Sequence, residues 1–588
     1  MSYTAPVERM KFALEHLADL DRLLSLEAFE HVTPDVVDAV LDGAARFAGD
    51  VLAPLNARGD REGAELTVDG VRAPGGFREA YRRFVADGWP SLAGAVEYGG
   101  QRLPTTVHAA VTEMWSAANH AFAMCPELAL GAARALEHHG TAEIQQRFLP
   151  RIVTGEWPCT MCLSEPQAGS DLAGITTLAE PDGDLWRLRG RKIYISWGEH
   201  DLTDNILHFI LARTADAPSG VKGLSLFLVP RYWIDATEHP GEPNDIRAVS
   251  IERKMGIHAS PTCVMTIGEQ HGARGWLVGE RHQGIACMFT MMNHMRLAVG
   301  LQAVGIADHA CQIAVGYARE RIQGRDARGR PAAIIAHADV RRMLLEMRAL
   351  TDGCRGLCYS VAALLDMADH AASPQVRQSA LSRADLLTPI VKAWGSDMGI
   401  EVTSLGVQVL GGAGYLEDTL AAQLYRDVRI TAIYEGTNGI QAQDLLGRKV
   451  ARDEGRALQA LMDEIRQRAG DLEAQLPGCT RFARILSEMV DQVEAATAHA
   501  LAGNIGDRAY TGAIAVDYLK LVGYVCIGWQ WAKLALATVT AGEHEAMRRG
   551  VLDCARFYGA HVLPRARAHA AVVLDGGASV AAVDADLL

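Results

Sequence analysis

One glutamate is the first candidate for chemistry in this chain. Glu435 lies between Tyr434 and Gly436, in a segment (residues 433–438) that holds no other acid. A carboxylate that can reach a substrate proton can act as a general base. Glu435 is therefore the candidate catalytic base.

Two earlier segments could line a ligand. Residues 162–171 contain a Pro and a Gly that force a loop, whose hydroxyls and backbone N–H groups can face a polar ligand. A plain connecting loop is the alternative. In residues 192–198, strand alternation places Tyr194 and Ser196 on one face, where a ring and a hydroxyl could line a flat cofactor. A tyrosine in the core is the alternative.

Two later segments could hold phosphate or approach a ligand closely. Residues 317–325 contain three Arg, and the planar guanidinium suits pyrophosphate, although a solvated helix end has the same composition. Residues 407–415 contain three Gly, which allow close backbone approach. They do not complete G-x-G-x-x-G, because Glu417 stands where the third Gly belongs, so no Rossmann nucleotide site is predicted.

The elements that must position these residues begin with helices. Apolar residues at helical spacing predict that residues 2–155 are mostly helical. Gly140 should end one helix, and Thr141 should begin the next. Pro150 is expected to interrupt this second helix.

Strand composition replaces the helical pattern near Trp157 and continues to about Glu280. Short β-rich runs separated by turn residues predict a compact antiparallel β domain. The clearest runs are residues 186–196, 206–212, 224–230 and 263–267.

Helical periodicity returns at Gly284. It predicts long helices over residues 291–325 and 338–367, and a last helical region from Glu454, broken at 477–478 and 503–504. The order predicts an α+β chain. The expected units are an N-terminal helical arm (1–40), an N-terminal α domain (41–157), a central β domain (158–280), a helical bundle (281–450) and an additional C-terminal helical domain (451–588).

Composition excludes some functions. The net charge is −14 and no basic block occurs, which disfavours nucleic-acid binding. Residues 449–588 hold 15 Lys and Arg against 17 Asp and Glu. That balance argues against a DNA-binding C-terminal part and against a cationic membrane-binding face.

The cysteines and the N-terminus favour a reducing, cytoplasmic location. There are 11 Cys without a disulfide rhythm, and Cys159 and Cys162 are interpreted as core residues rather than a redox pair. No apolar secretory signal is visible. No window of 18 uninterrupted apolar residues occurs, and residues 519–542 are interpreted as a buried helix. No metal site is predicted.

The combination of these motifs, in this order from Cys162 to Gln441, resembles the acyl-CoA dehydrogenase family over roughly residues 40–450. The N-terminal arm and the added C-terminal part resemble its large bacterial branch, which includes enzymes for fatty acyl-CoAs and 3-methylmercaptopropionyl-CoA. The resemblance implies the family fold, with an N-terminal helical domain, an antiparallel β domain and a C-terminal four-helix bundle.

The resemblance also implies that FAD is the cofactor and that two sets of residues bind it. The first set would hold the flavin and its ribityl–phosphate chain: Leu163, Ser164, Gly169, Ser170, Tyr194, Ser196 and Thr437. The second set would reach the pyrophosphate and adenosine from a neighbouring subunit: Arg321, Gln323, Gln408 and Gly412. Tyr194 stands where the family usually has a Trp, and Ser196 where it has a Thr. The shared site implies a homodimer.

The reaction implied by the resemblance is α,β-dehydrogenation of an acyl-CoA to a trans-2-enoyl-CoA, as in fatty acid β-oxidation. Glu435 would take the α-proton while a hydride leaves the β-carbon for flavin N5. A flavin ribityl hydroxyl and the Glu435 backbone N–H would stabilise the developing enolate, as in an oxyanion hole. Burial beneath the substrate should raise the Glu435 pKa. Electrons would pass to an electron-transferring flavoprotein.

The expected substrate contacts are Ser170, Asn293 and Arg296. Some relatives carry the base immediately before this arginine, where the present chain has Met295. Between Glu280 and Glu320 the only acid is Asp308, about three turns farther along. The alternative base is therefore missing, which strengthens the assignment to Glu435.

Other interpretations use the same scaffold. An acyl-CoA oxidase would pass electrons to O2, a DNA-binding flavoprotein would need a basic C-terminal part, and a catalytically dead relative would not need Glu435. Gly439 stands where many relatives carry a larger polar side chain, which could widen the acyl pocket or alter the flavin edge. Acyl chain length would depend on Phe289, Met291 and Met292.

Overall fold

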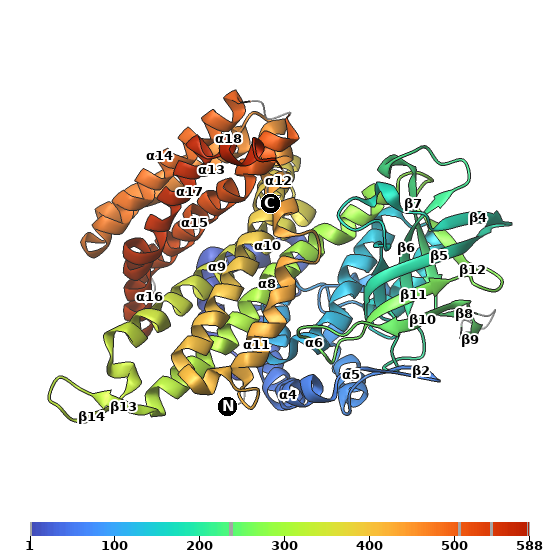
Figure 1. Ribbon diagram of the computed structural model, residues 1–588, viewed down its shortest axis with the longest axis horizontal. Helices are drawn as coiled ribbons and strands as arrows, with labels where there is room; N and C mark the ends of the chain where they lie inside the picture. Colours follow the sequence, from blue (N-terminus) through green and yellow to red (C-terminus); the bar gives the residue numbers. More distant parts are fainter. Residues whose placement is uncertain (1–2, 235–238, 504–506, 541–544, 585, 587–588) are drawn as a thin grey trace.

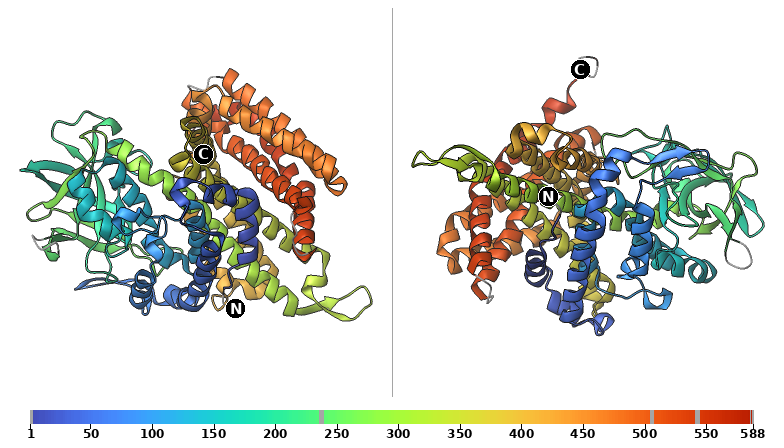
Figure 2. Two further views of the ribbon diagram at one scale, coloured as in Figure 1. Left: turned by 180° about the vertical axis from the view of Figure 1, so that it is seen from behind. Right: turned by 90° about the horizontal axis from the view of Figure 1, so that it is seen from below.

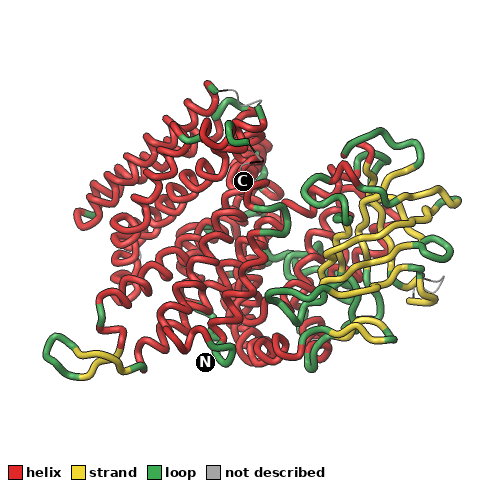
Figure 3. Tube along the Cα trace, in the orientation of Figure 1, coloured by secondary structure: helices red, strands yellow, loops and turns green. Residues whose placement is uncertain are grey.

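The computed structural model describes residues 3–234, 239–503, 507–540, 545–584 and 586. A β domain lies at one side of the molecule, long helices form the centre, and the last helices pack on the far side of that centre (Figure 1). Apart from short hairpins, the strands gather in the β domain (Figure 3). The predicted α+β fold is confirmed.

The N-terminal part is helical, as predicted. α6 ends at His139, before Gly140, and Thr141 caps α7 by accepting a 3.4 Å hydrogen bond from the Ile144 N–H. Pro150 lies inside α7 and does not interrupt it, so that prediction is wrong. The helices are α1 (Val7–Leu17), α2 (Leu20–Leu24), α3 (Pro34–Phe47), α4 (Ala53–Glu62), α5 (Phe77–Ala86), α6 (Thr105–His139) and α7 (Ala142–Val153), with a small hairpin of β1 (Glu65–Thr67) and β2 (Gly70–Arg72).

The β domain is built on one large mixed sheet. Its strands are β3 (Cys159–Cys162), β4 (Leu178–Asp182), β5 (Leu185–Ser196), β6 (Leu207–Thr214), β7 (Leu224–Pro230), β10 (Ile246–Ile251), β11 (Thr262–Ile267) and β12 (Ala273–Val278). The order is β10-β11-β5-β12-β7-β6-β3, and β4 pairs with β5 and β6. A separate hairpin joins β8 (Tyr232–Ile234) and β9 (Pro240–Pro243).

The prediction of a purely antiparallel sheet is wrong for two pairs of strands. β3 and β4 each pair with β6 in parallel. Strand composition predicts which segments form strands. Whether two strands pair in parallel or antiparallel depends on how the intervening chain connects them. A long segment, residues 163–177, follows β3, and β5 runs antiparallel to β4 before the chain returns as β6, so β6 runs in the direction of β4.

Both faces of this sheet are buried. Cys159 belongs to the hydrophobic cluster that the sheet shares with α6, α7 and α8, whereas Cys162 belongs to the cluster on the other side. The two thiols of this CxxC segment therefore face opposite ways, and both residues are buried and free. The interpretation as core residues is confirmed.

Long helices form the central bundle. They are α8 (Gly284–Glu320), α9 (Ala338–His370) and α10 (Pro374–Leu410), followed by the short α11 (Leu420–Val428) and α12 (Asn438–Gln443). α8 ends earlier than predicted, because residues 322–325 form β13 (Ile322–Arg325), which pairs with β14 (Pro331–Ala333). This hairpin projects from the end of the bundle away from the β domain (Figure 1).

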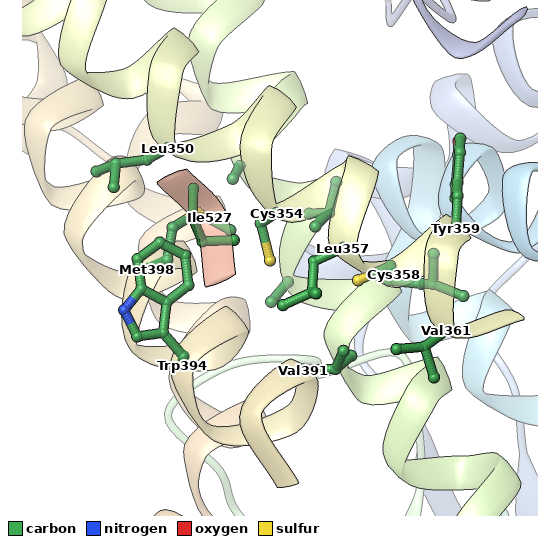
Figure 4. Close-up of a cluster of buried hydrophobic side chains, with 14 of the residues drawn as sticks. Leu350, Cys354, Leu357, Cys358, Tyr359, Val361, Val391, Trp394, Met398 and Ile527 are labelled. Atoms are coloured by element: carbon green, nitrogen blue, oxygen red, sulfur yellow. The ribbon is translucent and has the colours of Figure 1, made fainter. Parts of the chain in front are cut away.

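The additional helices pack against the bundle through α15. The elements are α13 (Arg456–Gln475), α14 (Thr480–Ala502), α15 (Arg508–Thr540), α16 (Glu545–Phe557), α17 (Ala566–Asp575) and α18 (Gly577–Ala581). Ile527 of α15 packs beside Leu350 and Cys354 of α9 and Trp394 of α10 (Figure 4). A break at Pro477 is confirmed, and α14 ends before Gly503, while residue 504 lies outside the described residues.

The N-terminal arm connects the bundle to the added helices. The Leu17 carbonyl, at the end of α1, accepts hydrogen bonds from Lys533 Nζ of α15 at 3.0 Å and from Ser360 Oγ of α9 at 3.2 Å. Figure 2 shows the first helices lying behind the bundle in the view of Figure 1. The two ends of the chain therefore share one packing unit.

Two helices, α8 and α15, are long and apolar enough to cross a membrane by length and composition. Their most apolar windows are 89% and 67% buried inside the molecule. Such burial is typical of helices in the core of a protein. The expected buried helix over residues 519–542 is confirmed for the part that α15 covers, up to Thr540.

Candidate active site

Glu435 sits in a tight, irregular turn between the short helix Arg429–Ala432 and α12. Its backbone is left-handed, with φ of 55°, a conformation that non-glycine residues adopt at a cost. Gln441 Nε2 donates to the Glu435 carbonyl at 3.1 Å, and Lys392 Nζ of α10 donates to the Gly436 carbonyl at 2.7 Å. The flanking Tyr434 hydroxyl donates to Gln302 Oε1 of α8. The turn is thus fixed from three directions.

The Glu435 carboxyl group has a strongly shifted pKa. Burial raises this pKa to about 7, although the positive charges of Arg296 and Lys392 oppose the rise. Burial also lowers the pKa of Lys392 to about 7, against the attraction of Glu435. A carboxylate with a pKa near 7 is a stronger base than an ordinary glutamate and still ionises near neutral pH.

Arg296 lies on α8 beside this carboxylate, as expected from its sequence position. It is buried, pairs with Asp444 at 3.1 Å, and lies over the Phe289 ring. Asn293 is exposed, one turn earlier. Met295 is buried, and Asp308 is held in a separate cluster by Arg355 at 3.0 Å.

A buried ion pair shapes the first segment predicted to bind the cofactor. Glu165 and Lys192 Nζ lie 2.8 Å apart, and Lys192 also donates to the Leu163 carbonyl at 3.0 Å. Glu165 accepts further hydrogen bonds from Thr176 and Thr177. Burial alone would raise the Glu165 pKa, but Lys192 and these donors outweigh it and lower the pKa to about 2. Residues 163–170 are therefore anchored to β5.

Tyr194 lies at an irregular point of β5. The pairing of β5 with β11 shifts between Lys192 and Ile195, and Tyr194 has φ of 60°. Its side chain is 64% exposed, so the alternative of a core tyrosine is wrong. Ser196 follows at the end of β5 and is partly buried.

These surfaces fit a bound flavin nucleotide. Gly169 and Ser170 are exposed, and no atom lies within 4 Å of a Cβ placed on Gly169. Leu163 and Ser164 are half-buried beside them, and the exposed Tyr194 ring offers an aromatic face. The geometry thus leaves room for a ligand along this loop and strand end.

The second predicted cofactor set lies elsewhere in the same chain. Arg321 and Gln323 are exposed at the base of the β13–β14 hairpin. Gln408 and Gly412 are also exposed, and Gly406 packs on Ala310, which places the end of α10 near that end of α8. The β domain lies at the other side of the molecule (Figure 1). One chain does not bring the two sets together.

The remaining predicted residue, Thr437, caps α12 by accepting a 3.4 Å hydrogen bond from the Ile440 N–H. A Cβ on Gly439 would meet only Thr437 Oγ1, at 3.9 Å, so the missing side chain leaves space at this helix start. Within the described part of the chain, no three His, Cys, Asp or Glu side chains are grouped to hold a metal ion.

Sequence reasoning missed three polar residues around the base. Lys392, Gln302 and Glu127 come from three helices and are all buried. No local motif surrounds any of them. Their only signal is a polar residue within an otherwise apolar helical face, as at Lys392 in the run from Leu386 to Trp394.

Comparison with known families covers nearly the whole chain. Residues 35–156, 160–269 and 282–450 match the N-terminal, middle and C-terminal domains of acyl-CoA dehydrogenase. Residues 458–584 match an acetyl-CoA dehydrogenase C-terminal-like domain.

Two curated relatives match over almost their full length. A 3-methylmercaptopropionyl-CoA dehydrogenase of Ruegeria pomeroyi is 42% identical, covering 99% of each chain. A broad-specificity linear acyl-CoA dehydrogenase of Mycobacterium tuberculosis is 33% identical, covering 96% of each.

Two solved structures share the fold at 20% identity. Caenorhabditis elegans ACDH-11 has a TM-score of 0.79, covering 98% of this chain and 96% of that one. A Bacillus anthracis acyl-CoA dehydrogenase complexed with FAD has a TM-score of 0.72, covering 96% and 91%.

The fold and the site define a flavoprotein oxidoreductase. The chain belongs to the acyl-CoA dehydrogenase family, whose cofactor is FAD and whose members dehydrogenate acyl-CoA thioesters.

Proposed function

We propose that this enzyme oxidises an acyl-CoA to its trans-2-enoyl-CoA with Glu435 as the base that removes the α-proton. The observation that carries the proposal is the partly buried Glu435 carboxyl, whose pKa is raised to about 7 by burial although the charges of Arg296 and Lys392 lower it. An α-proton is too weakly acidic for an ordinary exposed glutamate, and a desolvated carboxylate is a stronger base.

The neighbouring groups serve the same proton transfer. Arg296 and Lys392 keep part of the Glu435 population ionised at neutral pH. The rigid turn aims the carboxylate, and the Glu435 backbone N–H is available to an oxygen that gains charge in the transition state. FAD, when bound along Leu163–Ser170, Tyr194, Ser196 and Thr437, supplies the acceptor for the hydride that leaves the β-carbon.

The substrate and partners are inferred from relatives. The proposed substrate is an acyl-CoA thioester of the kind named for the relatives, with a 3-methylmercaptopropionyl or a linear acyl group. Ser170, Asn293 and Arg296 would line its site.

We infer a homodimer in which Arg321, Gln323, Gln408 and Gly412 of one subunit complete the FAD site of the other. We also infer a cytoplasmic enzyme whose electrons pass to an electron-transferring flavoprotein. The named relatives are dehydrogenases, which disfavours the oxidase alternative.

The test is anaerobic titration of the purified enzyme with acyl-CoAs of different chain length while flavin absorbance is recorded. The wild-type flavin should bleach with at least one ester, and Glu435→Gln should keep its FAD but fail to bleach. Bleaching by Glu435→Gln at the wild-type rate would refute the assignment of the base. Release of the enoyl product, checked by mass spectrometry, identifies the reaction.

A further inference from the structure

Tyr434, next to the proposed base, is fixed by α8. Its hydroxyl donates to Gln302 Oε1 and lies 3.4 Å from His120 Nε2 of α6. Because Glu435 has an unfavourable left-handed backbone, the position of its carboxylate depends on what holds the flanking residues. The Tyr434 side chain is one of those anchors.

Gln302 is oriented in turn by Glu127 of α6. The Gln302 amide Nε2 donates to Glu127 Oε2. An amide has a donor side and an acceptor side, so donation to Glu127 leaves Oε1 turned toward Tyr434. Gln302 is 1% exposed, so water does not compete for these bonds. A chain of two hydrogen bonds thus connects α6, α8 and the turn that carries Glu435.

Glu127 also borders a small cavity between α6 and α8. Its Oε1 and the Nδ1 of His294 have no hydrogen-bond partner among the described residues. Both groups line the cavity, together with Thr105, His108, Ala109, Thr112, Leu297, Ala298 and Leu301. Glu127 therefore uses one oxygen to hold Gln302, while the other has no partner among the described residues.

The charge state of Glu127 follows from its surroundings. Burial raises its pKa to about 8; the Gln302 hydrogen bond lowers the pKa, and the Glu435 charge raises it. Burial lowers the pKa of His108 and His120 on α6 to about 4, and that of His294 on α8 well below its usual value, so these rings are neutral.

The other charged or titratable groups of this region are Arg134 on α6, which acts on His108 and His294, Arg296 on α8, Lys392 on α10, and Glu435 with the Tyr434 phenol in the turn. Below its own pKa, Glu127 is a neutral hydrogen-bonding group.

We propose that Glu127 is a positioning residue that orients the catalytic base through Gln302 and Tyr434. The inference rests on the proposed role of Glu435. Glu127 touches no reacting atom in this scheme. Glu127 orients the Gln302 amide, and this amide orients the Tyr434 phenol. The phenol in turn holds the backbone turn that carries Glu435.

The test measures single-turnover flavin reduction against pH in four variants. Tyr434→Phe removes only the last hydroxyl, and Glu127→Met removes the first acceptor; each should slow reduction at least tenfold while FAD content stays at the wild-type level. Glu127→Gln keeps an acceptor for the Gln302 amide and should recover most of the rate lost in Glu127→Met. The double variant Glu127→Met/Tyr434→Phe should be no slower than the slower single variant, because both changes break one chain.

The pH profile separates positioning from a general loss of stability. The rise of the rate with pH, which Glu435 sets, should keep its midpoint in Tyr434→Phe and Glu127→Gln, and only the plateau should fall in Tyr434→Phe, because neither side chain shifts the pKa of the base. Wild-type rates in Tyr434→Phe, or a Glu127→Gln enzyme as slow as Tyr434→Phe, would overturn the proposal. If Glu127→Met does not bind FAD, the rates of Tyr434→Phe and Glu127→Gln still test the proposed role of Glu127. A Glu435→Gln enzyme that reduces its flavin would instead overturn the proposed function.

Discussion

At the residue scale, the environment of Glu435 is built from opposing effects, of which burial is the larger. Burial favours its protonated form, and two nearby cations favour its ionised form. The cations come from α8 and α10, whereas the glutamate lies on a turn without regular structure. The helices are held by their cores, so they can impose an unfavourable backbone on the turn.

The rate of flavin reduction should rise with pH through about 7. Glu435 must be ionised to take a proton, and its pKa is raised to about 7, so activity is lost as pH falls below that value. The measurement is anaerobic stopped-flow reduction at saturating acyl-CoA between pH 5.5 and 8. A profile that rises near pH 4.5, as for an ordinary glutamate, would contradict the raised pKa.

Replacing Lys392 by Met should move that rise to higher pH. Lys392 lowers the Glu435 pKa, so its removal leaves burial less opposed and makes the carboxylate harder to ionise. Reduction at pH 7 should fall about fivefold for the first unit by which the midpoint rises above 7. Lys222→Met, at an exposed position, is the control and should leave the profile unchanged.

At the element scale, the loop predicted to bind the cofactor is held to β5 by a buried ion pair. Glu165 and Lys192 fix residues 163–170 to β5, and the bulge beside Lys192 exposes Tyr194. Neither fact follows from strand alternation alone. The bulge breaks the period of two, so the sequence pattern correctly locates the strand but not the direction of every side chain.

Glu165→Gln should destabilise the enzyme and weaken FAD binding. Removing one partner of a buried pair typically costs about 3–5 kcal/mol, because the other charge remains buried without its counterion. The depressed Glu165 pKa means that its contribution is present above the unfolded value near 4.5 and is lost as pH falls toward 2. Thermal unfolding and FAD absorbance measure both effects.

The matched control is the exposed pair of Arg247 and Glu269, with a similar separation of 2.9 Å. Glu269→Gln should change stability by less than about 1 kcal/mol, since solvent screens surface pairs. Equal effects of the two substitutions would show that burial is not the cause.

Sequence patterns predict much of the fold and part of the site. Helical spacing locates α9 closely, and Gly140 and Thr141 locate the boundary between α6 and α7. A short motif selects Glu435 because its neighbours in sequence are also its neighbours in space. Lys392, Gln302 and Glu127 lie on three other helices, so no local pattern connects them with the base. The β13–β14 hairpin is missed because its pairing depends on a turn within a charged segment.

At the scale of the whole molecule, the two predicted cofactor surfaces lie on opposite sides of one folded subunit. Exposed Arg321 and Gln323 are carried by a projecting hairpin, and exposed Tyr194 lies in the β domain. A second copy could bring its hairpin to this β domain. This arrangement supports the proposed homodimer, with a mass in solution twice the 63.4 kDa of one chain.

Mixing two inactive variants should restore activity. In a dimer of Arg321→Ala and Glu435→Gln chains, one site combines intact Glu435 with the intact Arg321 of the partner, and the other site carries both defects. Refolding an equimolar mixture should therefore recover about a quarter of the wild-type rate, since half of the random dimers are mixed and each has one good site. No recovery, with mixed dimers verified by differently tagged chains, would show that Arg321 serves its own chain.

The contact between Leu17 and Lys533 has a consequence for biosynthesis. The two residues are 516 positions apart, and at about 5–20 residues per second the ribosome delivers Lys533 on the order of 25–100 s after Leu17. During this interval the end of α1 has emerged without the helix that will cover it. A nascent chain interrupted before α15 would leave the surface of α1 that packs against α15 exposed. The N-terminal arm can therefore complete its packing only after α15 has been synthesised.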